Sequence, residues 1–229
     1  LCQTYYTSKV SCIIFFKFFD GGWATLLVTG SLIGFAVLVK RHYKDTEKLL
    51  GRLEGLVKAA NAGASIPNTK PVPEADPKGK TAVFLVNGFN GLGLHTLLNI
   101  QRLFTGVYKN FVFVHIGLVD AGNFKGVEEM EALKEHVESE GMKYVDFMNR
   151  YGFYAESITA VGIDVVSEAA ELVPEILKRF PQSIFFGGQL VFPEDTFFTR
   201  FLHNNIVFAV QRRFYNQGIP FVILPVRVY

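Results

Sequence analysis

One stretch near the start of the chain contains no charged residue and limits what the protein can be. It covers residues 21–39 and has the sequence GGWATLLVTGSLIGFAVLV. As an α-helix, a stretch of this length extends about 28 Å, which is close to the hydrocarbon thickness of a bilayer. We therefore expect residues 21–39 to cross a membrane.

The residues that flank this stretch predict its orientation. Trp23 lies near one end, where an indole side chain favours the membrane interface. Five basic residues follow the other end: Lys40, Arg41, Lys44, Lys48 and Arg52. By the positive-inside rule, everything after residue 40 is expected in the cytoplasm. Two other interpretations are a cleaved signal peptide, whose basic residues normally precede the apolar run, and a buried helix of a soluble protein, which is usually shorter.

The residues before this stretch also have apolar character, as in TSKVSCIIFFKFF. The chain begins at Leu1 rather than Met. We therefore expect residues 1–16 to be the tail of a preceding span, residues 1–40 to be membrane segments, and the chain to be a piece of a longer protein.

The composition argues against several classes of protein. A net charge of +2 is too close to zero for a dedicated nucleic-acid-binding protein, so we expect no nucleic-acid partner. Apolar residues make up 49% of the chain, which excludes disorder throughout. The only cysteines are Cys2 and Cys12, too few for a disulfide framework or a zinc ligand set, and they point to a reducing compartment.

A helix is predicted to continue beyond the membrane over residues 41–60. Its apolar residues recur at helical spacing: Leu49, Leu53, Leu56 and Ala60. Glu54 and Lys58 form an i,i+4 pair on another side of this helix. The apolar stripe serves either dimerisation or docking, or it lies against the chain's own cytosolic domain or on lipid headgroups. Residues 61–80, with four prolines, are expected to be a linker.

From residue 81 onward, apolar runs alternate with helical patterns. The runs are expected to be buried strands, at residues 81–87, 110–119, 153–162, 183–188 and 220–228. The helical patterns lie at about residues 92–105, 125–150, 163–180 and 196–217. Strands joined by helical crossovers pair in parallel. Residues 81–229 are therefore predicted to form a doubly wound, Rossmann-like α/β domain with a parallel five-stranded sheet of order 3-2-1-4-5.

Doubly wound sheets bind ligands beyond the carboxyl ends of their strands, where the strand order reverses. Three glycine-containing segments are expected at this rim. They comprise Gly88, Asn90, Gly91, Gly93 and Thr96 after the first strand, Asp120, Gly122 and Asn123 after the second, and Gly187, Gly188 and Gln189 after the fourth. Backbone N–H groups at a helix N-terminus can hold a phosphate, and glycine permits its close approach. For the first two segments, an ordinary turn that has no ligand is favoured over a ligand site, and the same two interpretations are open for the third.

No arrangement of residues typical of catalysis or metal binding is found. The chain has no HExxH and no GxSxG motif, and its histidines at positions 42, 95, 115, 136 and 203 lack ligand spacing. We expect neither catalytic residues nor a metal site. His115, inside an apolar strand, is expected to be a hydrogen-bonded core residue. His203 and Asn204 begin a nearly apolar helix, where capping or packing is favoured over ligand binding.

Two parts of the chain resemble a family of membrane transporters. KFFDGGWATLLVTG followed by VKRHY is similar to the last span and its exit in bacterial permeases of the amino acid, polyamine and organocation (APC) superfamily. FLHNNIVFAVQRR and FVILPVRV resemble the closing helix and strand of the universal-stress-protein-like domain that a subset of these permeases carries, potassium importers among them. The resemblance extends over essentially the whole chain.

The resemblance implies a secondary transporter, an amino acid or potassium permease of the bacterial inner membrane, with a cytosolic regulatory domain that dimerises. Its partners would be the lipid bilayer, the rest of the permease and a second copy of the domain. The family's transport residues lie in earlier spans, so the chain would not transport a solute alone. Two other proteins fit the same sequence: a single-span protein with a sensory domain and a scaffold that only dimerises. A soluble α/β enzyme is a third.

In potassium-importing relatives this domain binds a cyclic adenine dinucleotide. An adenine nucleotide or cyclic di-adenylate is therefore the expected class of ligand at the three glycine-containing segments. The chain departs from the family in one respect. The segment GGQLVFPEDTFFTR lacks the glycine signature with which ATP-binding stress proteins hold a triphosphate.

Overall fold

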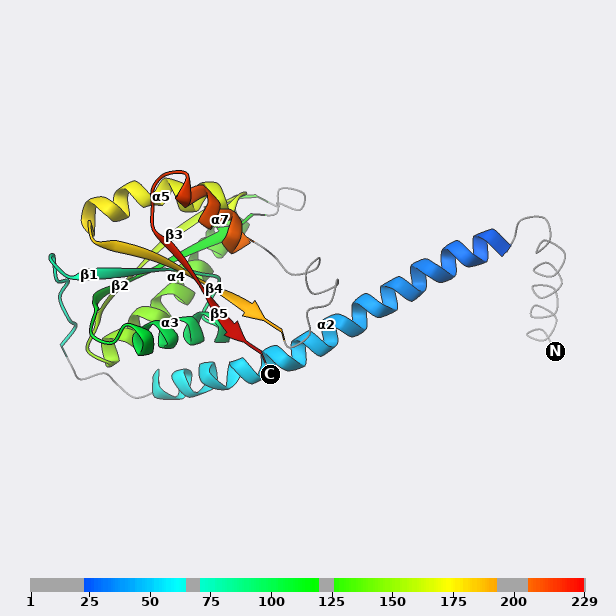
Figure 1. Ribbon diagram of the computed structural model, residues 1–229, viewed down its shortest axis with the longest axis horizontal. Helices are drawn as coiled ribbons and strands as arrows, with labels where there is room; N and C mark the ends of the chain where they lie inside the picture. The colour runs from blue at the N-terminus through cyan, green and yellow to red at the C-terminus, as the bar shows by residue number, and fades with distance from the viewer. Residues whose placement is uncertain (1–22, 65–70, 120–125, 193–205, 229) are drawn as a thin grey trace. The chain divides into compact units, whose positions relative to one another are not determined.

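The computed structural model describes residues 23–64, 71–119, 126–192 and 206–228 (Figure 1). It comprises two compact units, Leu1–Lys48 and Leu49–Tyr229. Helix α2 (Trp23–Ala64) contributes residues to both. The helix predicted over residues 41–60 is part of α2, which continues four residues further, to Ala64.

The first unit contains the apolar part of α2. Among the described residues, one helical segment, Trp23–Arg41, is long and apolar enough to cross a membrane, and none of it is buried within the protein. Nine of its large apolar side chains are more than half exposed: Trp23, Leu26, Leu27, Val28, Leu32, Ile33, Phe35, Val37 and Leu38. A helix on the surface of a soluble domain would bury one apolar stripe instead. The first two residues of the predicted span lie outside the described residues.

The second unit is built on a parallel sheet of five strands. They are β1 (Lys80–Val86), β2 (Tyr108–Leu118), β3 (Tyr154–Gly162), β4 (Ser183–Val191) and β5 (Phe221–Arg227). The strand order is β3-β2-β1-β4-β5, and every neighbouring pair is parallel. The prediction of a parallel α/β sheet with this order is confirmed. Because β1 is central, the order reverses between β1 and β4.

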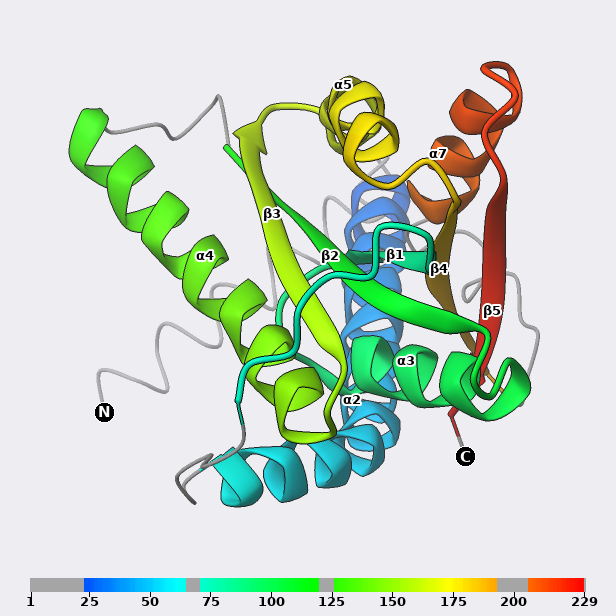
Figure 2. The ribbon, with the colours of Figure 1, turned by 90° about the vertical axis from the view of Figure 1, so that its left-hand side faces the viewer.

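Helices cover both faces of the sheet (Figures 1 and 2). Helices α3 (Gly91–Leu103) and α4 (Val127–Arg150) lie on one face, and α5 (Val165–Arg179) and α7 (Ile206–Tyr215) lie on the other. Residues 196–205, the predicted start of the last helix, lie outside the described residues, as do His203 and Asn204.

Alternating residues of β1 supply the two halves of the core. Phe84 is 1% exposed and stacks on Phe113 with 5.3 Å between ring centroids, on the side of α3 and α4. Val83 is fully buried on the side of α5 and α7. A strand buried on both faces has no exposed polar positions, which explains why residues 82–86 of β1 are all apolar.

The last turns of α2 pack on the sheet domain. Leu53 is 7% exposed and packs with Val226 and Val228 at the end of β5, while Val57 joins the core under α3 and α4. Of the alternatives for the apolar stripe, the structure shows the helix against its own domain. The compact unit accordingly begins at Leu49, whereas the sequence placed the start of the domain at residue 81.

Candidate functional site

A cavity of about 590 Å³ lies at the carboxyl ends of β1, β2 and β4. This is the point where the strand order reverses and where the sequence predicted a ligand. Most of the lining is apolar or glycine. Its polar lining residues are Asn87, Asn90, Thr96, His115, His136 and Gln189. No Lys, Arg, Asp or Glu is among the described lining residues.

The structure brings most of the predicted site residues to this cavity. The predicted residues that line it are Gly88, Asn90, Gly93, Thr96, Gly187, Gly188 and Gln189. Gly91 faces the opposite way and contacts Leu53 of α2. Asp120, Gly122 and Asn123 lie outside the described residues. Glu54, Glu140 and Tyr144 form hydrogen bonds with the turn beside the cavity. Sequence reasoning missed these contacts because the three residues come from helices far from the glycine segments in the chain.

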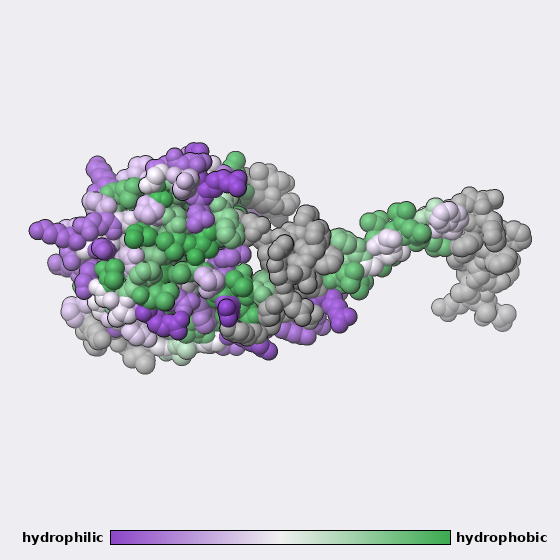
Figure 3. Space-filling model, viewed as in Figure 1, coloured by the Kyte–Doolittle hydropathy of each residue, from purple (hydrophilic) through white to green (hydrophobic). Residues whose placement is uncertain are grey.

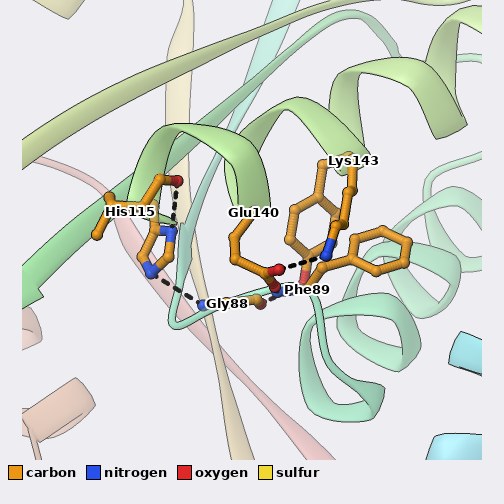
Figure 4. A network of polar contacts seen from close by, with 7 residues as sticks. Gly88, Phe89, His115, Glu140 and Lys143 are labelled. Carbon is orange, nitrogen blue, oxygen red and sulfur yellow. Dashed lines mark hydrogen bonds and ion pairs between the residues drawn. The ribbon is translucent and has the colours of Figure 1, made fainter. Parts of the chain in front are cut away.

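The turn from β1 into α3 has its backbone N–H groups engaged by side chains of the same chain (Figure 4). The N–H of Gly88 donates to His115 Nε2 (3.0 Å), and that of Phe89 donates to Glu140 Oε2 (2.7 Å). The N–H of Gly91 donates to Glu54 Oε1 (3.2 Å). Two carboxylates are therefore already bonded to amides at the start of α3: Glu140 to Phe89, just before the N-cap Asn90, and Glu54 to Gly91, the first residue of the helix.

Asn90 and Tyr144 complete this turn. The Asn90 side chain accepts a hydrogen bond from the Gly93 N–H (2.9 Å) as the N-cap of α3. The Tyr144 hydroxyl donates to the Gly88 carbonyl (3.0 Å). Burial raises the pKa of Tyr144, so this hydroxyl remains a donor at all physiological pH values.

His115 is a neutral, fully hydrogen-bonded core residue, as predicted. Its side chain is 4% exposed. Because a backbone N–H can only donate, Nε2 must be the acceptor of the Gly88 bond, and the ring proton lies on Nδ1, which faces the Val137 carbonyl at 3.1 Å. Burial lowers the pKa of His115 below its ordinary value of 6.5, against weaker opposing effects of the Val137 hydrogen bond and the Glu140 charge.

Glu140 is ionised at neutral pH and pairs with Lys143 on the next turn of α4 (Figure 4). Burial raises the pKa of Glu140, but the hydrogen bonds from Lys143 and from the Phe89 N–H outweigh it and hold the pKa below its usual value. A carboxylate at a helix N-terminus contributes about 0.3–1 kcal/mol through the helix dipole. Glu140 thus stabilises the turn and the start of α3.

The glycines around the cavity allow helices to pack closely on strands. A Cβ at Gly188 would lie 2.2 Å from Thr96 Oγ1 in α3, and one at Gly187 would lie 2.5 Å from Val207 Cγ2 in α7. A Cβ at Gly93 would lie 1.9 Å from the Tyr144 hydroxyl. These positions therefore need glycine for packing, whether or not a ligand binds.

The described residues do not fit a phosphate group at the start of α3. A phosphate there would compete with Glu54 and Glu140 for the same amides and would be repelled by both carboxylates. The described cavity lining offers no Lys or Arg to offset this repulsion. The cavity lies where the sequence predicted it. Its described polar lining residues include no Lys or Arg, and this favours an uncharged ligand.

No protein-family model and no curated protein matches the chain. A function is therefore argued from the apolar segment of α2, the cavity and the contacts around it.

Lowering the pH is expected to destabilise the fold through His115. The folded pKa is below 6.5, so on acidification the unfolded chain takes up a proton that the folded chain excludes. The contribution of His115 to the free energy of unfolding is complete above pH 6.5 and is lost as the pH falls through the folded pKa. Urea unfolding of the full chain in detergent micelles, followed by circular dichroism between pH 8 and pH 5, measures this loss.

The His115→Gln variant should be less stable at pH 8 and should show a smaller pH dependence in this range. His95→Gln, on α3 and outside the described lining of the cavity, is the matched control and should keep the slope of the natural chain. An equal slope in His115→Gln and the natural chain would contradict the assignment.

Proposed function

We propose that the chain is the C-terminal regulatory and dimerisation part of a secondary transporter, an amino acid or potassium permease of the APC type in the bacterial inner membrane. In this proposal α2 is its last span, and residues 49–229 are a cytosolic domain of universal-stress-protein type. The substrate path belongs to other spans of the permease.

The observation that carries the proposal is the composition of α2. One 42-residue helix has a first half with exposed apolar side chains and a second half with Leu53 and Val57 buried in the α/β unit. Large apolar side chains exposed around a whole helix are stable in lipid or against other spans. A helix of this kind joins a membrane-embedded part to a folded domain without a break.

The charges along α2 support the same orientation. Lys40 and Arg41 end the apolar segment, and three further basic residues follow within the next three turns: Lys44, Lys48 and Arg52. Basic residues at the end of a span favour the cytoplasmic side, where they face anionic lipids. The α/β unit follows them in the chain and is therefore assigned to the cytoplasm.

The cavity supports a binding role rather than a catalytic one. His115 is the buried base among its described residues, and both ring nitrogens are engaged in hydrogen bonds. The Thr96 hydroxyl donates to the Leu92 carbonyl (2.7 Å) and is 2% exposed. Neither group is free to act as a nucleophile or base, so a regulatory domain is favoured over an enzyme.

A second observation supports dimerisation of the domain. Strand β5 is at the edge of the sheet, and beside it α7 leaves a groove of about 670 Å³ with Phe208 and Tyr215 exposed by 46% and 79%. Val222 of β5 is 37% exposed. Figure 3 shows apolar surface gathered on the side of the unit that carries β5. An apolar sheet edge needs cover, and a second copy of the domain provides it.

The complete gene provides the first test of the proposed function. The reading frame upstream of Leu1 should encode several further apolar segments of about 20 residues, as a multispan permease requires. Deletion of residues 49–229 from that protein should change the rate of solute uptake in cells. A reading frame that starts immediately before this chain would favour the single-span sensor instead.

The orientation predicts a protease result. Protease added to intact cells should leave residues 49–229 undegraded, because the domain lies behind the membrane, and permeabilised cells should lose them. Immunoblotting of a C-terminal tag distinguishes the two conditions. Degradation in intact cells would place the domain outside.

The dimer interface predicts the effect of a single charge at the sheet edge. Val222→Lys should convert the full chain in detergent from dimer to monomer, since the new charge would be buried against the second copy. Val72→Lys, at an apolar position that is 70% exposed, is the control and should remain dimeric. Light scattering at micromolar concentrations measures the mass. A dimeric Val222→Lys variant, or a monomeric natural chain, would contradict this interface.

A further inference from the structure

The contact between α2 and the first turn of α3 leaves no room for a side chain on α3. A Cβ at Gly91 would lie 2.5 Å from Leu53 Cβ and 2.7 Å from the Leu53 carbonyl carbon. The same turn is held by the bond from the Gly91 N–H to Glu54 Oε1 (3.2 Å). Gly91, which the sequence assigned to a ligand, is therefore the docking point of α2.

A second docking point holds the other end of this helix. Arg150, the last residue of α4, donates from its guanidinium to the carbonyls of Gly63 (3.2 Å) and Ala64 (2.9 Å). These carbonyls belong to the last turn of α2, where helical partners are missing and the helix dipole favours a cation. Glu54 and Arg150 thus place opposite charges at the two ends of the docked segment.

Between these points the docked segment buries little. Leu53 and Val57 are the buried side chains among its described residues, and Leu50, Leu56 and Ala60 are partly buried. The exposed residues are Gly51, Arg52, Gly55, Lys58, Ala59 and those at positions 61–64. A segment with few buried apolar contacts and polar contacts at its ends opens at a lower free energy than the sheet core.

The first turn of α3 contacts the cavity and the docked helix at once. Leu92 lines the cavity and packs in the cluster that contains Leu53. Asn90 and Gly93, on either side of it, also line the cavity. A shift of this turn therefore changes both the shape of the cavity and the surface on which α2 docks.

We propose that residues 49–64 form a latch, a segment that detaches from the first turn of α3 and couples the state of the cavity to α2. The role of the latch rests on the proposed function, in which α2 is the last span of a permease. The coupling passes through the contact of Leu92 with the cluster that contains Leu53, which has a docked and a detached state. A change in the cavity that displaces Leu92 weakens the docking of Leu53.

Hydrogen–deuterium exchange of the full chain in lipid nanodiscs tests the latch directly. Gly91→Ala places a methyl group against the backbone of Leu53, so peptides from residues 49–64 should exchange about tenfold faster or more, while peptides from β1 and β2 keep their protection. Glu54→Gln, which removes only the charge, should act in the same direction with a smaller effect. Glu131→Gln, an exposed position on α4, is the control for loss of a negative charge.

Two neighbouring glycines test the coupling. Gly188→Ala would press on Thr96 and Leu92 from the cavity side, and Gly187→Ala would press on Val207 in α7 on the opposite face of the sheet. Faster exchange of residues 49–64 is expected in Gly188→Ala and not in Gly187→Ala. The same response from both variants, or no response from Gly188→Ala, would overturn the coupling.

Two results for Gly91→Ala and Glu54→Gln would overturn the latch itself. One is unchanged exchange of residues 49–64 in both variants, and the other is an increase that extends equally to β1 and β2. These measurements do not involve solute uptake. The latch can therefore fail while the proposed function stands, and uptake can be independent of the domain while the latch is real.

Discussion

The turn between β1 and α3 needs acceptors for its backbone N–H groups, and three other elements supply them. The start of a helix leaves its first amides without helical partners, and the turn itself is buried beside the sheet. His115 from β2, Glu140 from α4 and Glu54 from α2 accept these bonds. Because each acceptor comes from a distant part of the sequence, the turn fixes β2, α4 and α2 relative to β1.

The same arrangement determines the charge at the cavity's edge. A helix N-terminus in a doubly wound fold is an anion-binding position, and in this protein the anions are carboxylates of the chain itself. Lys143 compensates Glu140 locally and keeps it ionised. An anionic ligand would have to displace a bonded carboxylate, whereas an uncharged ligand meets apolar walls and the polar groups of Asn90 and Gln189. The cavity therefore favours uncharged ligands, because carboxylates of the chain are already bonded to the amides beside it.

The fold follows from the sequence because it depends on repeated patterns. Runs such as residues 81–87 and 110–119 are mostly apolar because strands buried on both faces have no exposed side, and the helical intervals between them require parallel pairing. The place of the cavity follows from the strand order alone. These inferences need no knowledge of which side chains meet.

The contacts of the glycines could not be predicted in this way. The sequence alone does not show whether a glycine makes room for a phosphate or for a neighbouring helix. Only the atoms that surround it in the structure distinguish the two cases. Gly91 meets Leu53 and Gly188 meets Thr96, pairs that are separated by 38 and 92 positions respectively. Likewise, the sequence pairs Glu54 with Lys58 at i,i+4, because nothing nearby in the sequence shows that Glu54 accepts a hydrogen bond from the Gly91 amide.

The length of α2 has a related physical cause. Residues 61–64, Asn-Ala-Gly-Ala, include Asn and Gly, which have low helix propensity, and the four prolines from residue 67 onward indicated a linker over residues 61–80. Arg150 supplies the missing partners of the last carbonyls, so the helix extends to Ala64. The helix end is thus stabilised by tertiary contact rather than by local preference. The end of α2 and its docking on the domain therefore depend on the same contact with Arg150.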